Sequence, residues 1–415
     1  MLHKRVKLLS DRLEISFKKI TIVGLLGFSS GLPLALTGGT LQGWMAESGI
    51  DIKTIGLFSA VALPYSLKVL WSPAMDRFTL PFLGRRRGWI FLTQILLFIF
   101  ISSVAILSPI KTPLFLGIVA LCISFSSASQ DIVVDAYRTD ILTEKERGPG
   151  VGIFLTGYRI AMLTSGAGAM VMADRIGWER TYLIMAFLML LSVLWTLLAE
   201  EPEGKIQPPK TLRDAIILPL KDFFSRKSPI LFLLFIILYK LGDAYGASLM
   251  TAFLIKGVGF SAGEVGAINK GIGLISLIIG AMMGGGLVSK LGLFRSLFFF
   301  GILQAVSNLS FTLLAVYGKS YILFAISVIF ENLSGGMGSS AFVSFLMGMC
   351  NKNYSATQYA LFSSIASLGR TMISPTSGFL AEKVGWVAFF PITALFALPG
   401  IFLLFPLKKE IEKLS

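Results

Sequence analysis

Apolar and polar stretches alternate along the chain, and this pattern divides it into twelve apolar runs with short polar connections. A bilayer core of about 30 Å requires about 20 apolar residues in a helix, which is the length of these runs. A strand of a transmembrane barrel is shorter and alternates between its two faces, and the runs do neither. We therefore predict an all-α membrane protein with twelve transmembrane helices. The predicted helices lie at 20–42, 54–74, 88–108, 113–137, 150–173, 179–199, 229–255, 264–288, 294–316, 320–347, 356–380 and 385–407.

The largest polar interval, 200–228, separates six runs from the other six. The pattern Ala-acid-base-aliphatic-Gly-Trp occurs at 173–178, before the sixth run, and again at 381–386, before the twelfth. The segments 49–56 and 259–266 also resemble each other at nearly the same offset. Such matches indicate two parallel six-helix repeats. We therefore predict an N-terminal half at 1–199, a cytoplasmic linker at 200–228 and a C-terminal half at 229–415.

The linker contains one segment with an apolar face. In residues 211–224, Leu212, Ile216, Leu220 and Phe224 fall on one side of a helix. This spacing predicts an amphipathic helix at the membrane interface, and a plain polar linker is the alternative.

Composition supports a membrane protein, because 54% of the residues are hydrophobic and only 14% are charged. Soluble domains have about 45–50% apolar and about 25% charged residues. The net charge of +14 reflects topology: about 25 of the 37 Lys and Arg fall in loops and tails on one side. This bias places both termini in the cytoplasm and makes a nucleic-acid partner unnecessary. The two cysteines lie in different halves, so we predict no disulfide, no metal site and no cofactor.

The loop after the second run carries Asp76-Arg77, followed by the segment 84–88 with sequence Gly-Arg-Arg-Arg-Gly. These residues resemble the loop between helices two and three of the major facilitator superfamily, although residues 78–83 separate the two parts here. The resemblance implies a conformational latch, because an acid at a helix end binds basic groups and the dipole of a neighbouring helix. A positive-inside signal alone is the alternative. The predicted gating motif consists of Asp76, Arg77, Gly84, Arg85 and Arg86.

Four further segments narrow the resemblance. Residues 27–42, 70–73, 127–136 and 157–159 resemble the AmpG muropeptide permease family, and the similarity is strongest over 20–200. The resemblance implies an importer of anhydromuropeptides, products of cell-wall recycling, in the bacterial inner membrane, driven by the proton gradient. In bacteria with that circuit, this import supplies the signal for β-lactamase induction. Acetyl-CoA transporters share part of the signature, so another anionic metabolite, such as acetyl-CoA or a siderophore, is the alternative substrate.

Ionisable residues inside the apolar runs provide the candidate proton sites. A charge in the middle of a bilayer costs about 2.5–3.5 kcal/mol on insertion scales, so it is usually functional or paired. Asp131 and Asp135 lie four residues apart in the fourth run, Asp243 lies in the seventh and Glu331 in the tenth. Because the single histidine, His3, lies in the N-terminal tail, proton coupling must use these carboxylates. Pairing with Arg138 or Lys240 is the structural alternative.

Basic residues in the runs are candidates to hold the carboxylates of an anionic ligand. The substrate-binding candidates are Arg159, Lys240, Lys270 and Arg370, together with Gly31, Gln130 and Tyr158 from the family-like segments. We expect alternating access between two halves, for which a monomer is sufficient, with a small-molecule substrate and protons as partners. An enzyme is disfavoured because the sequence has no H-E-x-x-H or G-x-S-x-G motif. A channel would not require repeated halves.

Overall fold

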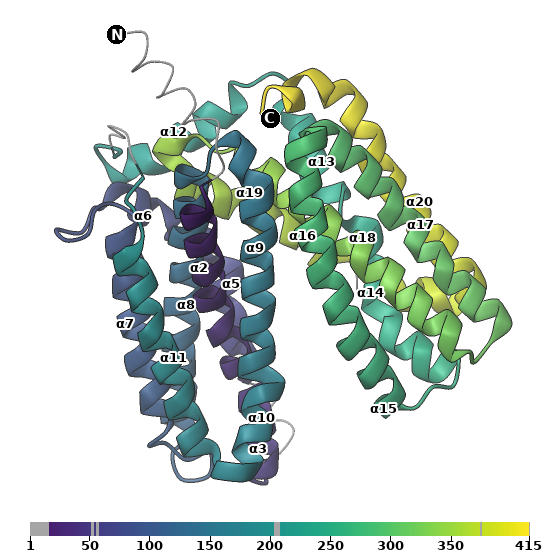
Figure 1. Cartoon of the computed structure of the whole chain (residues 1–415), viewed down its shortest axis with the longest axis horizontal. Coiled ribbons are helices and arrows are strands. Elements are labelled where there is room, and N and C mark those ends of the chain that lie inside the picture. The colour runs from purple at the N-terminus through teal and green to yellow at the C-terminus, as the bar shows by residue number, and fades with distance from the viewer. Residues whose placement is uncertain (1–15, 51–53, 55–57, 203–207, 374–375, 415) are drawn as a thin grey trace.

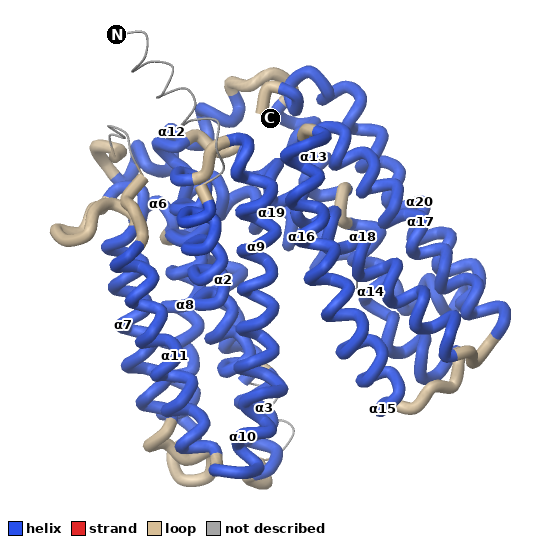
Figure 2. Tube along the Cα trace, in the orientation of Figure 1, coloured by secondary structure: helices blue, strands red, loops and turns tan. Residues whose placement is uncertain are grey.

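The computed structural model describes residues 16–50, 54, 58–202, 208–373 and 376–414, and its described elements are helices (Figures 1 and 2). The first bundle contains α2 (Phe17–Thr37), α3 (Gly39–Glu47), η1 (Ser59–Ala62), α5 (Leu63–Leu67), η2 (Lys68–Leu70), α6 (Ser72–Arg77), α7 (Arg87–Val104), α8 (Pro113–Ile141), α9 (Glu144–Leu163), η3 (Thr164–Gly168), α10 (Ala169–Ile176) and α11 (Trp178–Leu198). A linker helix follows, α12 (Leu212–Phe224). The second bundle contains α13 (Pro229–Leu238), α14 (Leu241–Ala252), η4 (Phe253–Gly257), α15 (Ala262–Val265), η5 (Gly266–Ile272), α16 (Gly273–Leu291), α17 (Leu293–Tyr317), α18 (Tyr321–Gly348), η6 (Lys352–Tyr354), α19 (Ser355–Ile373) and α20 (Ser377–Glu412).

Where its residues are described, every predicted apolar run coincides with helical structure, but not every run is one continuous helix. Among the described residues, nine helices are long and apolar enough to cross a membrane. The run at 54–74 is divided into η1, α5, η2 and α6, and it contains Pro64 and Pro73, which start helices and interrupt longer ones. The all-α membrane architecture is therefore confirmed, and the number of twelve crossings stays a prediction.

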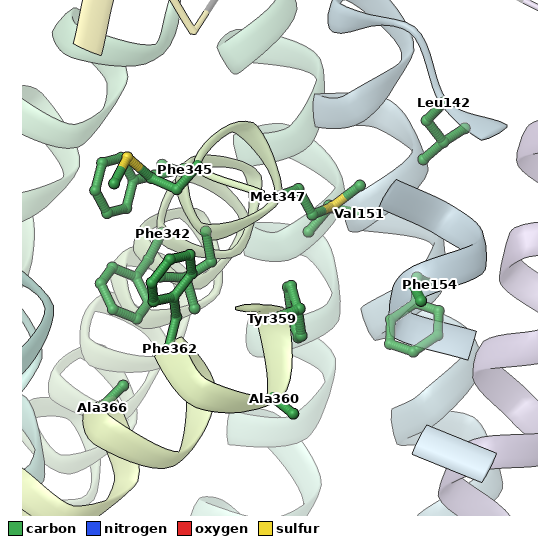
Figure 3. Packing of buried hydrophobic residues seen from close by; sticks show 14 of the residues in the cluster. Leu142, Val151, Phe154, Phe342, Phe345, Met347, Tyr359, Ala360, Phe362 and Ala366 are labelled. Carbon is green, nitrogen blue, oxygen red and sulfur yellow. The ribbon is translucent and has the colours of Figure 1, made fainter. Parts of the chain in front are cut away.

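The two bundles meet at one end and diverge toward the other (Figure 1). We call the first the termini end, because α2 begins there and α20 ends there. A buried apolar cluster joins the bundles at this end: Leu142, Val151 and Phe154 belong to the first bundle, and Phe342 and Phe345 to the second (Figure 3). The termini end is thus packed shut by side chains from both halves. The boundaries 1–199, 200–228 and 229–415 agree with this arrangement and stay a prediction.

Close backbone contact between α9 and α16 brings the two halves together. A Cβ atom added to Gly148 would lie 2.3 Å from the carbonyl oxygen of Gly285. A Cβ atom added to Gly285 would likewise lie 2.3 Å from the carbonyl oxygen of Gly148. Small residues permit such approaches between membrane helices. No L-side chain fits at this crossing while the termini end is closed.

We expect Gly285→Ala to weaken closure of the termini end without unfolding either half, because the clash lies between the halves. The native Cys350, half-buried after α18 at this end, is a reporter, and its labelling by a thiol reagent should become several-fold faster. Gly286→Ala is the matched control, since a Cβ atom there meets nothing within 4 Å. Equal labelling of the two variants would contradict the assigned contact.

The repeated Gly-Trp pairs have the same conformation in both halves. Gly177 has φ 85° and ψ 159°, and Gly385 has φ 73° and ψ 166°, a region that is essentially restricted to glycine. Each glycine breaks the helix, so that Trp178 stacks on Trp44 and Trp386 packs against Phe253. The sequence repeat therefore corresponds to a repeated local structure.

Candidate functional site

A cavity between the two halves is lined by residues of α9, α16, α18 and α19. Its two basic residues come from opposite halves: Arg159 from α9, and Lys240 from the break between α13 and α14. Tyr359 and Phe342 add aromatic surface, and Ser339 and Ser363 add hydroxyl groups. The cavity therefore offers two positive charges, hydrogen-bonding groups and aromatic rings to a single ligand.

Lys240 belongs to a charged group in the second half. Its Nζ lies 3.4 Å from Oδ2 of Asp243 and donates a hydrogen bond to Oε1 of Gln304. A second cavity, next to the first, is lined by Lys240, Asp243 and Glu331 together. Glu331 accepts a hydrogen bond of 3.0 Å from Nδ2 of Asn332. Among the described side chains of this group, two carboxylates therefore share one base.

The corresponding group in the first half lies on α8. Asp135 pairs with Arg138, with 2.7 Å between Oδ1 and NH2, and its Oδ2 lies 3.8 Å from Nζ of Lys68. Asp131, one turn earlier, interacts electrostatically with Lys68, Asp135 and Arg138. In this group two acids therefore face two bases.

Arg138 connects that group to the second half. It donates a hydrogen bond to the hydroxyl of Tyr359 and lies over the rings of Phe154, at 4.1 Å, and Tyr359, at 5.1 Å. Because Tyr359 also lines the central cavity, Arg138 fixes part of the cavity wall from the opposite half.

Of the remaining substrate-binding candidates, the three that the structure describes are not among the residues lining the cavity. Gly31 is packed against α9, where an added Cβ atom would lie 2.4 Å from the carbonyl oxygen of Tyr158, so it serves helix packing. Gln130 is buried and donates a 2.9 Å hydrogen bond to Oγ of Ser29 on α2. The ring of Tyr158 lies 6.4 Å from that of Phe154. The side chains of Lys270 and Arg370 lie outside the described residues.

The gating motif forms a buried network at the termini end. Asp76 is fully buried, and its Oδ1 accepts hydrogen bonds from Arg85, at 3.1 Å, and from Arg86, at 2.8 Å. Its Oδ2 accepts from the backbone N–H of Thr357, at 2.8 Å, and from the Thr357 hydroxyl, at 2.7 Å. Thr357 lies in the first turn of α19, whose unpaired N–H groups and positive dipole end favour an anion. Asp76 therefore joins the first half to a helix end of the second.

Arg86 extends this network. It donates to Oδ2 of Asp140 at 2.9 Å and to the hydroxyl of Ser355 at 2.7 Å. Arg85 reaches the carbonyl of Asn353 at 2.7 Å. Burial and the neighbouring Arg86 lower the pKa of Arg85 to about 10, which leaves it charged at neutral pH. Both arginines thus bridge the halves in their charged form.

The other two motif residues have different places. Gly84 has φ 87°, and an added Cβ atom would lie 2.7 Å from Cδ of Glu201, so glycine is required for this turn. Glu201 accepts hydrogen bonds from the backbone N–H groups of Arg86 and Arg87, which fixes the loop. Arg77 lies 5.6 Å from the ring of Phe78 and is not among the described partners of Asp76.

Sequence reasoning missed Thr357, Tyr359 and Gln304, which hold Asp76, Arg138 and Lys240 respectively. All three are uncharged polar residues, and such residues are common in membrane helices. For Thr357 the available signal was the polar segment 351–358, which extends into the start of the eleventh run and meets the gating motif.

Comparison with known proteins places the chain among transporters. Residues 23–374 match the Major Facilitator Superfamily. The chain is 50% identical over 392 residues to the anhydromuropeptide permease of Escherichia coli K12, covering 94% of this chain and 80% of that protein. It is 36% identical to the putative transporter AmpG 4 of Rickettsia felis, covering 94% of this chain and 96% of that one.

Solved structures agree on the fold. The Escherichia coli fucose:proton symporter superposes with a TM-score of 0.73 at 12% identity, covering 94% of this chain and 98% of the symporter. A proton:xylose symporter gives a TM-score of 0.70 at 13% identity, covering 95% of each chain. At these identities the likeness shows the fold alone.

Proposed function

This chain belongs to the major facilitator superfamily and, within it, to the family of the anhydromuropeptide permeases, and we propose that it imports anhydromuropeptides for cell-wall recycling. It is a multi-pass membrane transporter rather than an enzyme. The relative from Escherichia coli supports the substrate, because half of the aligned residues are identical over nearly the whole chain. A different anionic metabolite is the alternative within the same fold.

One observation carries the proposal: Arg159 and Lys240 approach a single cavity from opposite halves. A muropeptide carries carboxylate groups on its peptide and hydroxyl and amide groups on its sugars. Guanidinium and ammonium groups bind carboxylates through charge-assisted hydrogen bonds. Ser339 and Ser363 offer hydroxyl groups to the sugars. A ligand held by both halves at once favours the state in which they have moved together around it.

Alternating access then follows from the arrangement of the bundles. The basic bias of the loops favours a cytoplasmic location for the termini end. With that end closed, the transporter would receive ligand from outside the cell. Opening of the network around Asp76 would release ligand inside. One chain supplies the cavity and both halves, so a monomer suffices.

Proton coupling would use the charged group of the second half. An ionised carboxylate that is buried without a partner is costly, and proton uptake removes the cost. Asp243 and Glu331 share Lys240 among the described side chains, so one of them is the more favourable proton acceptor. Asp131 and Asp135 are more evenly matched by Lys68 and Arg138, but Asp131 remains an alternative acceptor.

The direct test is uptake of labelled N-acetylglucosaminyl-anhydro-N-acetylmuramyl-peptide by cells that lack their own permease and express this chain. We expect saturable uptake that a protonophore abolishes. Uptake that persists with the protonophore would exclude proton coupling. No uptake by correctly inserted protein would exclude the muropeptide substrate and move the search to other anionic metabolites.

Neutralising the cavity bases should weaken ligand binding. We expect Arg159→Gln and Lys240→Gln each to raise the KM for uptake by about tenfold or more, since a charged hydrogen bond contributes about 1.5–3 kcal/mol. Lys256→Gln is the matched control, because Lys256 is exposed on η4, away from the cavity residues. Unchanged KM values in both cavity variants would remove these residues from the binding site.

A further inference from the structure

The linker helix α12 has three distinct faces. At about 100° per residue, Ala215, Pro219 and Phe223 fall on one face, and all three are buried. Asp214 and Lys221 fall on a polar strip on the opposite side of the helix. Between these faces lies an apolar arc, whose members are between 37% and 55% exposed. The arc consists of Ile216, Ile217, Leu220 and Phe224, with Arg213 on the same side of the helix, and the exposed Leu212 lies on the side of the buried face at the start of the helix.

The buried face is bound to the second half close to the gate. Asp222 accepts 2.9 Å hydrogen bonds from Asn351 and from Gln358, and Gln358 also donates to the carbonyl of Pro219 at 3.1 Å. The rings of Phe223 and Phe362 lie 5.3 Å apart. Gln358 is the residue after Thr357, the partner of Asp76. The position of α12 therefore bears directly on the first turn of α19.

Hydrogen bonding keeps this attachment charged. Asp222 is partly buried, which opposes its ionisation, but the bonds from Gln358, Asn351 and Arg226 outweigh that effect and lower the pKa of its carboxyl group. Arg226 in turn donates to the carbonyl of Met349 at 2.6 Å. The C-terminal half of α12 is thus fastened to the turn between α18 and α19.

The apolar arc lies next to the start of a candidate membrane span. α12 ends at Phe224, and the apolar span of α13 begins only a few residues later, at Pro229. Ile230, in the first turn of that span, is 66% exposed, so apolar surface is also present at the start of the span. Exposed basic residues accompany the arc: Lys210, Arg213, Lys221 and Lys227. The apolar arc can contact acyl chains. The basic groups, which are carried on long apolar stems, can reach and bind the phosphates of anionic lipids.

We propose that α12 docks on the surface of the membrane at the termini end, with its apolar arc among acyl chains and Arg213 and Lys221 at anionic headgroups, and that this docking holds the gate closed. The lipid is a partner of the closed state, because α12 packs there against α6 of the first half as well as against α19 of the second. Loss of anionic lipid would release α12 and loosen the network at Thr357. The inference concerns the gate and does not depend on the identity of the transported ligand.

Spin labels can locate the arc. In a background with Cys122→Ser and Cys350→Ser, nitroxides are attached through Ile216→Cys, Leu220→Cys and Asp214→Cys in the full chain in phospholipid vesicles. We expect the first two labels to be relaxed by oxygen and the third by a water-soluble nickel chelate. Equal exposure of all three labels to the nickel chelate would overturn the proposal. Shielding of the first two labels from both reagents would overturn it as well, because protein would then cover the arc.

The coupling to the gate is tested in vesicles of phosphatidylcholine with and without phosphatidylglycerol. With the native Cys350 present, we expect its labelling to be several-fold faster without phosphatidylglycerol. The double variant Arg213→Gln/Lys221→Gln should label fast in both vesicles. Arg175→Gln/Arg180→Gln, which removes the same number of charges from α10 and α11, should behave like the parent chain. Labelling of the parent chain that is independent of phosphatidylglycerol would overturn the coupling.

Discussion

Replacing Asp76 with asparagine should reduce uptake by at least about tenfold while leaving both bundles folded. Asp76 is fully buried and holds two arginines and the first turn of α19 at once. Removing one partner of a buried, hydrogen-bonded charge pair costs about 3–5 kcal/mol, and about 1.4 kcal/mol already corresponds to tenfold. The bonds from Thr357 join the halves, and the two arginines that Asp76 holds reach Asn353 and Ser355 of the second half, so the loss falls on the closed state. The cycle would then lack a state that receives ligand.

Labelling of Cys350 separates this effect from misfolding. Burial keeps the pKa of the Cys350 thiol well above its usual range, so it reacts slowly while the termini end is closed. In Asp76→Asn we expect fast labelling together with normal insertion. Thr357→Ala, which removes only the hydroxyl donor and keeps the backbone donor, should give a smaller change in the same direction. Slow labelling of Asp76→Asn combined with full uptake would refute the latch.

The second large effect is expected for Glu331→Gln, which should abolish proton-driven accumulation while retaining exchange of ligand across the membrane. The substitution removes the titratable group but preserves the size of the side chain and one hydrogen-bond acceptor. Exchange requires only that the loaded carrier move between its two states, whereas accumulation requires a proton to travel with the ligand. The measurements are concentrative uptake and counterflow in vesicles, with and without a proton gradient.

Asp131→Asn is the informative comparison for this assignment. If Asp131→Asn abolishes accumulation and Glu331→Gln does not, the coupling proton belongs to the first half. If both variants lose accumulation, the two charged groups act together. Retention of full accumulation by Glu331→Gln would remove Glu331 from the coupling mechanism.

The fold and the family could be read from the sequence because both depend on local patterns. Apolar length predicts membrane helices, and the repeated Gly-Trp pairs mark the same helix break in each half. Boundaries were less accurate where hydrogen bonding, rather than hydropathy, starts a helix. The predicted run at 150–173 corresponds to a helix that begins at Glu144, because Thr143 and Glu146 form a capping box in a charged segment.

The candidate site was only partly predictable for a related reason. Charged residues in apolar runs are conspicuous, so the sequence identifies Arg159, Lys240 and Asp243. It does not show that Lys240 shares one cavity with Arg159 and another with Asp243. The partners of such charges, Gln304 for Lys240 and Tyr359 for Arg138, are ordinary polar residues on other helices. Only the packing of helices far apart in sequence gives them a role. Gly31 is the opposite case. It lies in a segment that resembles the family and was predicted to bind substrate, but it packs against helix α9.

The contact between Gly148 and Gly285 sets a mechanical limit on the motion. Where side chains meet, the distance between two helices can vary, because the side chains can change rotamer. Here a peptide group meets a peptide group, so rocking toward the closed position stops at one fixed distance. Ligands with peptides of different length would therefore alter how far the opposite end spreads, while the termini end returns to the same seal after every cycle.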